Sequence, residues 1–569
     1  MNLLIIDGIG PFFRHYRTKR INWSKVPFSH IETGNGIRED YLRTLPEDFA
    51  RLVRGASAVG YNAVTLDDVA HLSPHAAYPP PLNRKIDAYR RLYARLFEIA
   101  CAHSMRVFLT TDVMYYNAAL RRRLGRSVER VTEHLAGALD TLFAEFQCLA
   151  GIIVRFGEQD GRDVSGDFES RMVLRRPADA RAFVKGLLPV FERHNRLFVF
   201  RTWSVGAYQI GDLMWNADTY DRVFDGISSR NLAVSMKYGE SDFFRYLPLN
   251  RLFARGCQQK IIEFQARREY EGFGAYPSFV GWDVERYLRA LGGACNLIGA
   301  SVWCQTGGWG RRRQLTYVRN SSPWVELNAE VIAALCRGAS CEEAVASYCA
   351  RRTTPLDTGR MLEFLRMSEE VIHKLLYMSE LGERTLFFRR LRLPPQLHVF
   401  WDRVIVNHTV KRILKCLVTD RERCIREGWE GLATLQRMRA VAETHGLPRK
   451  GLDYQLATYR ILATAREYFF RPYSRRVVDS LHALAEEYRA RYRRHYSVML
   501  DFRRSGLPKV SIRWFIRSML RDHGEYSWKD QVLTLRLVSW IYPMLRRWQR
   551  RAVPSFAAKQ TMGIDAFLK

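Results

Sequence analysis

Three carboxylic acids in the first half of the sequence, Glu158, Asp242 and Glu269, could carry out acid–base chemistry. Each follows a short apolar run, and the basic residues Arg201 and Lys237 end two runs of the same kind. Cleavage of a glycosidic bond needs one protonated carboxyl group to donate to the leaving oxygen and one ionised carboxylate to activate water. The three acids can supply both groups if the fold brings them together.

The two basic residues indicate what the substrate carries. A guanidinium such as that of Arg201 grips a carboxylate through two parallel hydrogen bonds, and the ammonium of Lys237 adds a point charge. The sugar is therefore predicted to be a uronic acid. Further candidates for binding it are Glu263, which lies in an apolar run of its own, and the aromatic residues Trp23 and Trp203, whose rings could stack on sugar faces.

The elements that must position these residues are short β-branched runs that alternate with helical stretches. Seven runs are clear, and a further, first strand is expected near Arg20-Ile21-Asn22. The seven lie at 62–66, 106–110, 151–155, 197–201, 231–236, 259–264 and 299–303. This pattern predicts an α/β fold, a (β/α)8 TIM barrel over residues 1–355, whose carboxyl strand ends would gather the polar residues. A doubly wound open sheet is the alternative, although no glycine-rich phosphate-binding sequence follows any run.

The sequence changes character after the linker at 352–359. Residues 356–569 have the period of helices, which predicts an all-helical and basic C-terminal domain. Residues 351–569 hold 43 Lys and Arg against 22 Asp and Glu, out of 89 and 59 in the whole chain. Such a charge favours peripheral contact with a membrane or another polyanion, for instance through 532–548. A nucleic-acid partner is not expected, because three acids in one cavity would repel phosphate.

The most specific part of the sequence is the stretch 231–274. It contains NLAVSMK at 231–237, SDF at 241–243, IEFQ at 262–265 and REYEG at 268–272. In order and spacing this stretch resembles the signature of the α-glucuronidases of glycoside hydrolase family 67. Weaker similarity at 60–64, 106–109 and 154–158 extends the resemblance over residues 20–350. Because barrel-like sequence begins almost at Met1, the family's N-terminal β-sandwich is expected to be absent.

The resemblance assigns a role to each charged residue. It implies that Glu158 is the general acid, with Asp163 as the second choice because the acid-bearing loop is abbreviated. It implies that Asp242 and Glu269 position and deprotonate the attacking water. Arg201 and Lys237 match residues that bind the sugar's carboxylate. The family inverts configuration, so we expect removal of a terminal α-linked glucuronic or related uronic acid from an acidic oligo- or polysaccharide.

The sequence also bears on an alternative function, on cofactors, on location and on oligomeric state. The alternative function is a non-hydrolytic protein of acidic-glycan binding or polysaccharide assembly, built on a hydrolase scaffold. No cofactor and no metal are expected, since the 10 cysteines are scattered without a C-x-x-C pair. Without a signal-like or membrane-spanning segment, a cytoplasmic location is the simplest expectation. A homodimer is compatible with the family resemblance.

Overall fold

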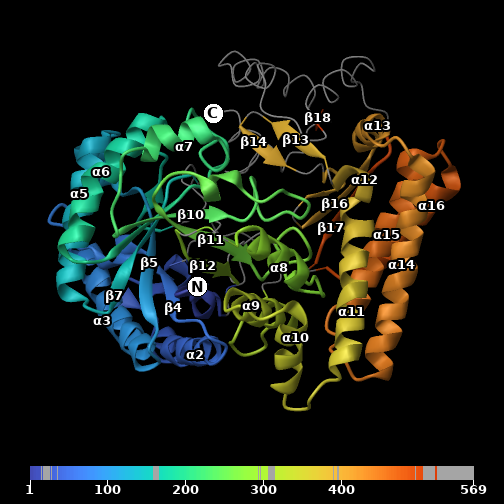
Figure 1. The fold of residues 1–569 in the computed structure, drawn as a ribbon, viewed down its shortest axis with the longest axis horizontal. Helices are drawn as coiled ribbons and strands as arrows, with labels where there is room; N and C mark the ends of the chain where they lie inside the picture. The colour runs from blue at the N-terminus through green and yellow to red at the C-terminus, as the bar shows by residue number, and fades with distance from the viewer. Residues whose placement is uncertain are drawn as a thin grey trace.

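The computed structural model describes residues 1–503 and 520–521, apart from residues 15, 17–25, 27, 35, 158–165, 293, 295, 305–313, 383, 389, 394–395, 401 and 494. Its centre is a closed barrel of eight parallel strands (Figure 1). In pairing order these are β1 (Leu3–Asp7), β12 (Leu297–Trp303), β11 (Gln259–Gln265), β10 (Leu232–Lys237), β9 (Leu197–Arg201), β7 (Leu149–Arg155), β5 (Arg106–Asp112) and β4 (Ala63–Asp67). β4 pairs with β1 and closes the ring. The predicted barrel is confirmed.

The first barrel strand is not where the sequence analysis expected it. The structure builds this strand from Leu3–Asp7, whose five residues are all buried, and it pairs with β12 and β4. A parallel barrel strand is covered on both faces, so a short apolar run without alternation suffices to form it. The prediction of a first strand near Arg20-Ile21-Asn22 is therefore wrong, and residues 20–22 lie outside the described part of the chain.

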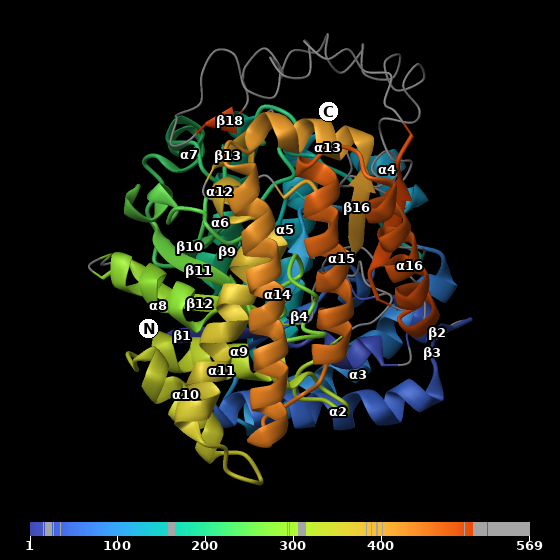
Figure 2. The same ribbon diagram turned by 90° about the vertical axis from the view of Figure 1, so that its right-hand side faces the viewer.

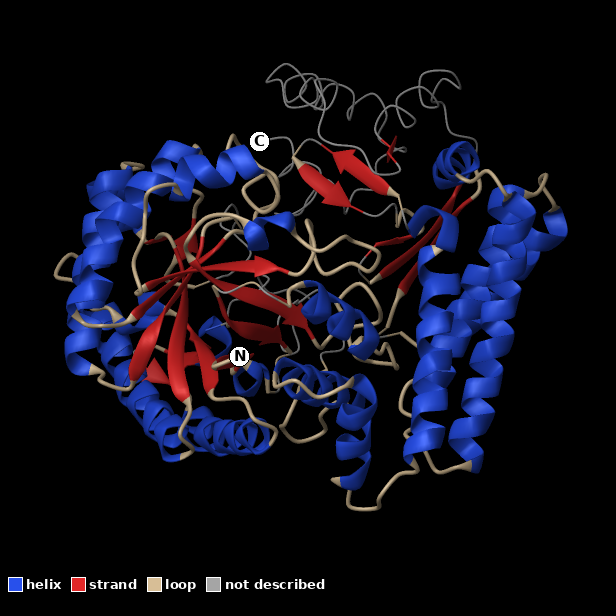
Figure 3. Ribbon diagram, in the orientation of Figure 1, coloured by secondary structure: helices blue, strands red, loops and turns tan. Residues whose placement is uncertain are grey.

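Helices cover the outside of the barrel (Figure 3). In chain order they are α1 (Phe28–Ile31), α2 (Glu39–Ala58), α3 (Pro80–Ala102), α4 (Ala118–Leu124), α5 (Val128–Glu145), α6 (Pro177–Arg193), α7 (Ala217–Phe224), α8 (Gly281–Ala290), α9 (Pro323–Cys336) and α10 (Cys341–Ala350). Their inward faces follow the helical period, as in α3, which buries Ile86, Tyr89, Tyr93 and Leu96. Two short antiparallel pairs join loops: β2 (Glu32–Thr33) with β3 (Gly36–Ile37), and β6 (Tyr115–Tyr116) with β8 (Glu169–Ser170).

The inside of the barrel changes from apolar to polar along the strands. Alternate residues of a strand face the same side, so every second residue points to the barrel axis. Toward the amino ends these inward residues form one apolar cluster of Leu3, Ile5, Ala63, Phe108, Ile153, Val199, Ala233 and Ile261. Two or four residues further along, the inward positions are charged. The polar end is the carboxyl end, where barrel enzymes carry their active sites.

A largely helical region lies against one side of the barrel (Figure 2). It consists of α11 (Thr358–Val371), a π-helix (Ile372–Tyr377), α12 (Ser379–Gly382), α13 (His408–Leu417), α14 (Arg421–Thr444), α15 (Leu452–Phe470) and α16 (Arg475–Arg491). Two small sheets accompany these helices: β14 (Leu391–Leu393), β13 (Thr385–Phe388) and β18 (Leu520–Arg521), and β15 (Val399–Phe400), β16 (Arg403–Asn407) and β17 (Ser497–Asp501). The helical character is confirmed, but the expectation of an all-helical domain is corrected by these strands. β16 pairs with β17 in parallel, a contact between distant segments that helical periodicity does not reveal.

The predicted division at residues 355 and 356 falls between α10 and α11, and it stays a prediction. One hydrophobic core runs from the barrel into the C-terminal region, and the rings of Trp324 and Phe364 stack across the junction at 5.7 Å. Among the described residues, no helix combines the length and apolarity needed to span a membrane. The segment 532–548, predicted to contact a membrane, lies outside the described part of the chain.

Candidate active site

The carboxyl ends of the barrel strands carry a ring of buried polar side chains. The ring consists of Asp7 (β1), Asp67 (β4), Asp112 (β5), Arg155 (β7), Arg201 (β9), Lys237 (β10), Glu263 and Gln265 (β11) and Trp303 (β12). Each is at most 7% exposed. Buried charges are stable only when they are paired or hydrogen-bonded, so the pairing pattern defines what the ring can do.

Arg201 and Glu263 form a two-pronged ion pair inside the ring. The Nε and Nη2 atoms of Arg201 donate to different oxygens of Glu263, both at 2.8 Å. Ser235 Oγ and Trp303 Nε1 donate to the same carboxylate, at 2.7 and 3.1 Å. Burial alone would raise the pKa of Glu263, but Arg201 and these hydrogen bonds hold that pKa below its ordinary value. Glu263, predicted to contact substrate, is thus the counterion that orients Arg201.

Lys237 and Asp242 form a second pair, from β10 and the loop that follows it. The Lys237 ammonium donates to Asp242 Oδ1, and it lies 3.4 Å from the centre of the Trp203 ring and 4.3 Å from that of Phe243. The other oxygen, Asp242 Oδ2, accepts a hydrogen bond of 2.7 Å from the Tyr270 hydroxyl. One face of Trp203, predicted to stack on a sugar, is therefore occupied by an ammonium, an arrangement stabilised by cation–π attraction.

Glu269 is buried close to this pair and is 3% exposed. Burial, and then the negative charge of Asp242, raise the pKa of Glu269 to about 8, against the opposing effects of Lys237, Arg267 and Tyr270. Two carboxylates in one water-poor site cannot both ionise readily. The raised pKa keeps Glu269 largely protonated at neutral pH, beside an Asp242 carboxylate that is paired with Lys237. The site thus holds a group that can donate a proton next to a group that can accept one.

The loop after β11, which carries Glu269, turns back sharply just after this residue. The side-chain oxygen Oε1 of Gln265 accepts a hydrogen bond of 2.7 Å from the Glu269 backbone N–H. Just beyond, Gly272, Phe273 and Gly274 all have positive φ, at 86°, 57° and 73°. The left-handed region is open to glycine without steric cost, so the two glycines allow the chain to turn back sharply after the acid.

Several predicted site residues cannot be placed. Glu158, its alternative Asp163 and Trp23 all lie outside the described residues. The chain leading to Glu158 is described as far as Gly157, which forms a β-bridge with Ser204 next to the end of β9. The residue just before the predicted acid is therefore held next to β9, and the role of Glu158 stays a prediction.

Sequence reasoning missed the polar residues on the other side of the ring. Arg155 bridges two carboxylates, with Nε 3.1 Å from Asp112 Oδ1 and Nη2 3.2 Å from Asp67 Oδ2, and Ser170 Oγ donates to Asp112. Asp7 Oδ2 accepts a hydrogen bond of 3.0 Å from the backbone N–H of Cys304. The alternation of side chains along a strand could have identified these residues. Each of the charged residues lies an even number of positions beyond an apolar residue that faces the barrel axis, so it faces the axis too.

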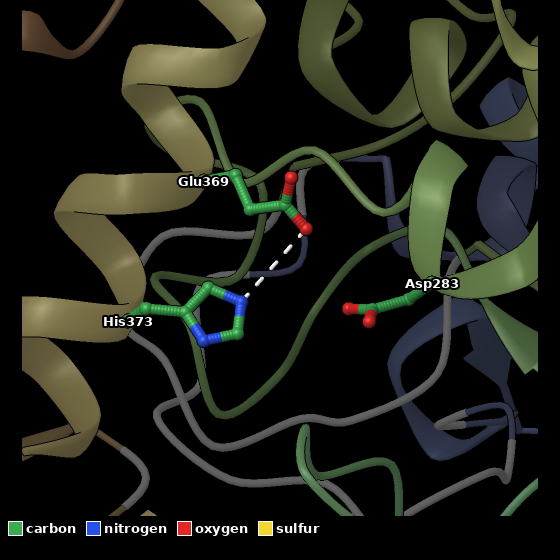
Figure 4. A group of neighbouring side chains, drawn as sticks. All are labelled: Asp283, Glu369 and His373. Atoms are coloured by element: carbon green, nitrogen blue, oxygen red, sulfur yellow. Dashed lines mark ion pairs between the residues drawn. The ribbon is translucent and has the colours of Figure 1, made fainter. Parts of the chain in front are cut away.

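A separate group of potential metal ligands lies outside the barrel. Asp283 on α8, Glu369 on α11 and His373 in the π-helix after α11 have ligand atoms within 4.8 Å of one another (Figure 4). A guanidinium is already there, because Arg245 Nη1 lies 2.8 Å from Asp283 and 3.6 Å from Glu369. Arg286 pairs with the other Asp283 oxygen at 2.9 Å. A metal ion would have to displace these cations, so the group is a set of ion pairs rather than a metal site.

Comparison with known proteins finds similarity of fold only. No protein-family model and no curated protein sequence matches the chain. Among solved structures, the chain resembles a glycoside hydrolase family 138 enzyme that targets pectin rhamnogalacturonan II, with a TM-score of 0.50 and 11% identity. That match covers 87% of this chain, which spans 62% of the length of the other. The likeness concerns the fold.

A second solved structure is an O-GlcNAc hydrolase variant from Thermobaculum terrenum, with a TM-score of 0.37 and 12% identity over 78% of this chain and 85% of the other. The first structure is described as a family 138 enzyme and not as one of family 67. The resemblance to family 67 α-glucuronidases therefore stays a prediction from the sequence.

Proposed function

We propose that the chain is a glycoside hydrolase that removes a terminal α-linked glucuronic or related uronic acid from an acidic oligo- or polysaccharide. The observation that carries this proposal is the burial of Asp242 and Glu269 in one site, with Asp242 paired to the Lys237 ammonium and the pKa of Glu269 raised. Two neighbouring carboxyl groups, one of them with a raised pKa, are suited to acid–base catalysis at the carboxyl end of a barrel. The fold likeness to a family 138 enzyme that targets a polysaccharide is consistent with a carbohydrate substrate.

The pair would act on the attacking water. At neutral pH one member is ionised and accepts a proton from water as the oxygen attacks the anomeric carbon. Because the raised pKa keeps Glu269 protonated at neutral pH, Asp242 would be the member that accepts the proton, and Glu269 would orient the water. Glu158 would donate a proton to the leaving oxygen from the opposite face of the sugar. Attack by water opposite the leaving group inverts the anomeric configuration, with about 6.5–9.5 Å between acid and base.

Lys237 and Arg201 would recognise the carboxylate of the sugar. The Lys237 ammonium lies against aromatic rings in a site shielded from water, where its attraction for an anion is stronger than in bulk water. The Nε and Nη2 atoms of Arg201 are already hydrogen-bonded to Glu263. Arg201 would therefore contribute a fixed positive charge, and not two parallel hydrogen bonds from these atoms to the sugar's carboxylate. A uronic acid is thereby favoured over a neutral hexose.

The proposal is tested with a panel of glucuronylated and galacturonylated oligosaccharides, each beside its neutral hexose counterpart. Wild type should release the uronic acid and leave the neutral counterpart intact. Asp242→Asn and Glu269→Gln should each lower release at least about a hundredfold. Glu443→Gln, which changes a carboxylate 62% exposed, should behave as wild type.

One outcome would favour the alternative function. If wild type releases no sugar from any member of the panel but binds the acidic oligosaccharides more tightly than the neutral ones, the chain is an acidic-glycan-binding or assembly protein on a hydrolase scaffold.

A further inference from the structure

The two loops that carry Asp242 and Glu269 are joined by a buried ion pair of their own. Arg245 follows Asp242 by three residues in the loop after β10, and Glu271 follows Glu269 by two in the loop after β11. Arg245 is 1% exposed and Glu271 is 0% exposed. Arg245 Nε lies 3.1 Å from each oxygen of Glu271. The loops are thus tied together within three residues of the reacting acids.

The Glu271 carboxylate is the centre of this junction. Besides Arg245, it accepts hydrogen bonds from Arg268 Nε at 3.1 Å, from Ser278 Oγ, and from the Tyr377 hydroxyl at 2.9 Å. Burial alone would raise the pKa of Glu271, but the two arginines outweigh it and hold that pKa well below its ordinary value. A carboxylate with this many donors from four different chain positions keeps one position.

The Arg245 guanidinium extends the junction to two helices. It donates to the backbone oxygen of Phe279 at 2.5 Å and to Asp283 on α8 at 2.8 Å. It also lies 3.6 Å from Glu369 on α11, beside the group drawn in Figure 4. The loop after β10 is therefore fixed against the loop after β11, the barrel helix α8 and the C-terminal helix α11.

Tyr377 contributes a single hydroxyl group that touches both loops. Its oxygen accepts a hydrogen bond of 3.1 Å from the backbone N–H of Arg245 and donates one of 2.9 Å to Glu271 Oε1. Tyr377 ends the π-helix that follows α11, and it is 1% exposed. Single π-helical turns are rare and occur frequently at functional sites. The C-terminal region contacts the acid-bearing loops at several points, and at Tyr377 one hydroxyl group bonds to both loops.

We propose that Tyr377 is a positioning residue of the active site, which fixes the separation of Asp242 and Glu269 by bridging Arg245 and Glu271. This inference rests on the proposed hydrolase function for its catalytic consequence. Two carboxylates that hold one water between them must keep their spacing to a fraction of an ångström. The C-terminal helical region is then part of the catalytic framework and not a separate binding module.

The first test compares Tyr377→Phe with a matched control, Tyr459→Phe. Tyr459 also places a buried hydroxyl between the barrel and the C-terminal helices, where it donates to the Tyr276 hydroxyl at 3.2 Å. Both variants should lower the melting temperature by similar amounts. Only Tyr377→Phe should lower kcat, by about tenfold or more, with KM changed less than about threefold. If the wild type is active and Tyr377→Phe has the same kcat, the proposal is overturned.

The second test needs no substrate, so it separates this inference from the proposed function. Infrared difference spectra against Glu269→Gln identify the band of the protonated Glu269 carboxyl, and its pH dependence gives the pKa. The groups that face Glu269 are Asp242, Lys237, Arg267 and Tyr270. Tyr377→Phe should move the pKa from about 8 toward the ordinary glutamate value, as Asp242 draws away. The same titration in Tyr377→Phe and Tyr459→Phe would overturn the proposal, whatever the activity.

Discussion

Arg201 and Glu263 meet edge to edge in the barrel although 62 residues separate them in the chain. They lie on β9 and β11, with β10 between these strands. Inward residues of alternate strands share a layer in barrels of this kind, so strand parity and barrel closure together bring guanidinium and carboxylate into contact. Ser235, the inward residue of β10 between them, donates to the same carboxylate. The pair is therefore a consequence of the barrel itself.

Removing the negative charge of this pair should destabilise the fold strongly. Glu263→Gln leaves the Arg201 guanidinium buried without its counterion, a change that costs about 3–5 kcal/mol in comparable cases. Urea denaturation followed by circular dichroism measures the free energy of unfolding. Glu443→Gln is the control, because its pair with Arg449 is 62% exposed on both sides and should contribute nothing measurable. A loss below about 1 kcal/mol for Glu263→Gln would contradict the view of a dry, fully paired site.

The raised pKa of Glu269 should make stability depend on pH. Between about 4.5, the ordinary glutamate value, and about 8, the folded protein holds a proton on Glu269 that the unfolded chain has lost. A proton that only the folded state binds stabilises that state, and this stabilisation decreases as pH rises. The free energy of unfolding should therefore fall across this pH window.

The matched variant is Glu269→Gln, which resembles the protonated side chain at every pH. The free energy of unfolding of Glu269→Gln minus that of the wild type should be larger at pH 8 than at pH 5. Urea denaturation at both pH values measures this difference. A difference between the two proteins that stays constant from pH 5 to pH 8 would show that Glu269 has an ordinary pKa.

Gly157 should be essential for placing the predicted acid. A Cβ atom at this position would lie 2.4 Å from both Ser204 Cα and the Trp203 backbone oxygen, so Gly157→Ala must push the end of β7 away from β9. Because Glu158 is the next residue, sugar release should fall by about tenfold or more. Gly137→Ala on α5, where nothing lies within 4 Å of the added atom, should keep full activity. Equal activity in the two variants would remove the case for Glu158 as the acid.

Much of the barrel could be predicted from sequence because its signals are local. Runs such as Leu149–Arg155 are short and rich in apolar, β-branched residues, and each is bounded by helical stretches. Leu3–Asp7 carries the same apolar signal, but the prediction placed the first strand near Arg20-Ile21-Asn22 instead. The order of acids and bases after the strands predicts that Arg201, Lys237, Asp242 and Glu269 gather at the carboxyl end of the barrel, and their roles stay predictions.

The partners of these residues could not be predicted from local signals. Nothing in the sequence around Glu263 distinguishes a substrate-binding carboxylate from the counterion of Arg201, because that depends on the register of non-adjacent strands. Tyr377 lies 106 positions from Glu271 along the chain, and only the packing of α11 on the barrel brings them together. The raised pKa of Glu269 likewise arises from burial, which is a property of the folded state.

The most direct test of the account is a proton NMR time course of the wild type with an α-linked glucuronyl oligosaccharide. We predict that free glucuronic acid appears first as the β anomer, that the wild type releases no hexose from the neutral counterpart, and that Glu269→Gln abolishes release. First appearance of the α anomer would contradict the inverting mechanism. Undiminished release by Glu269→Gln would contradict the central claim that the Asp242 and Glu269 pair carries out the chemistry.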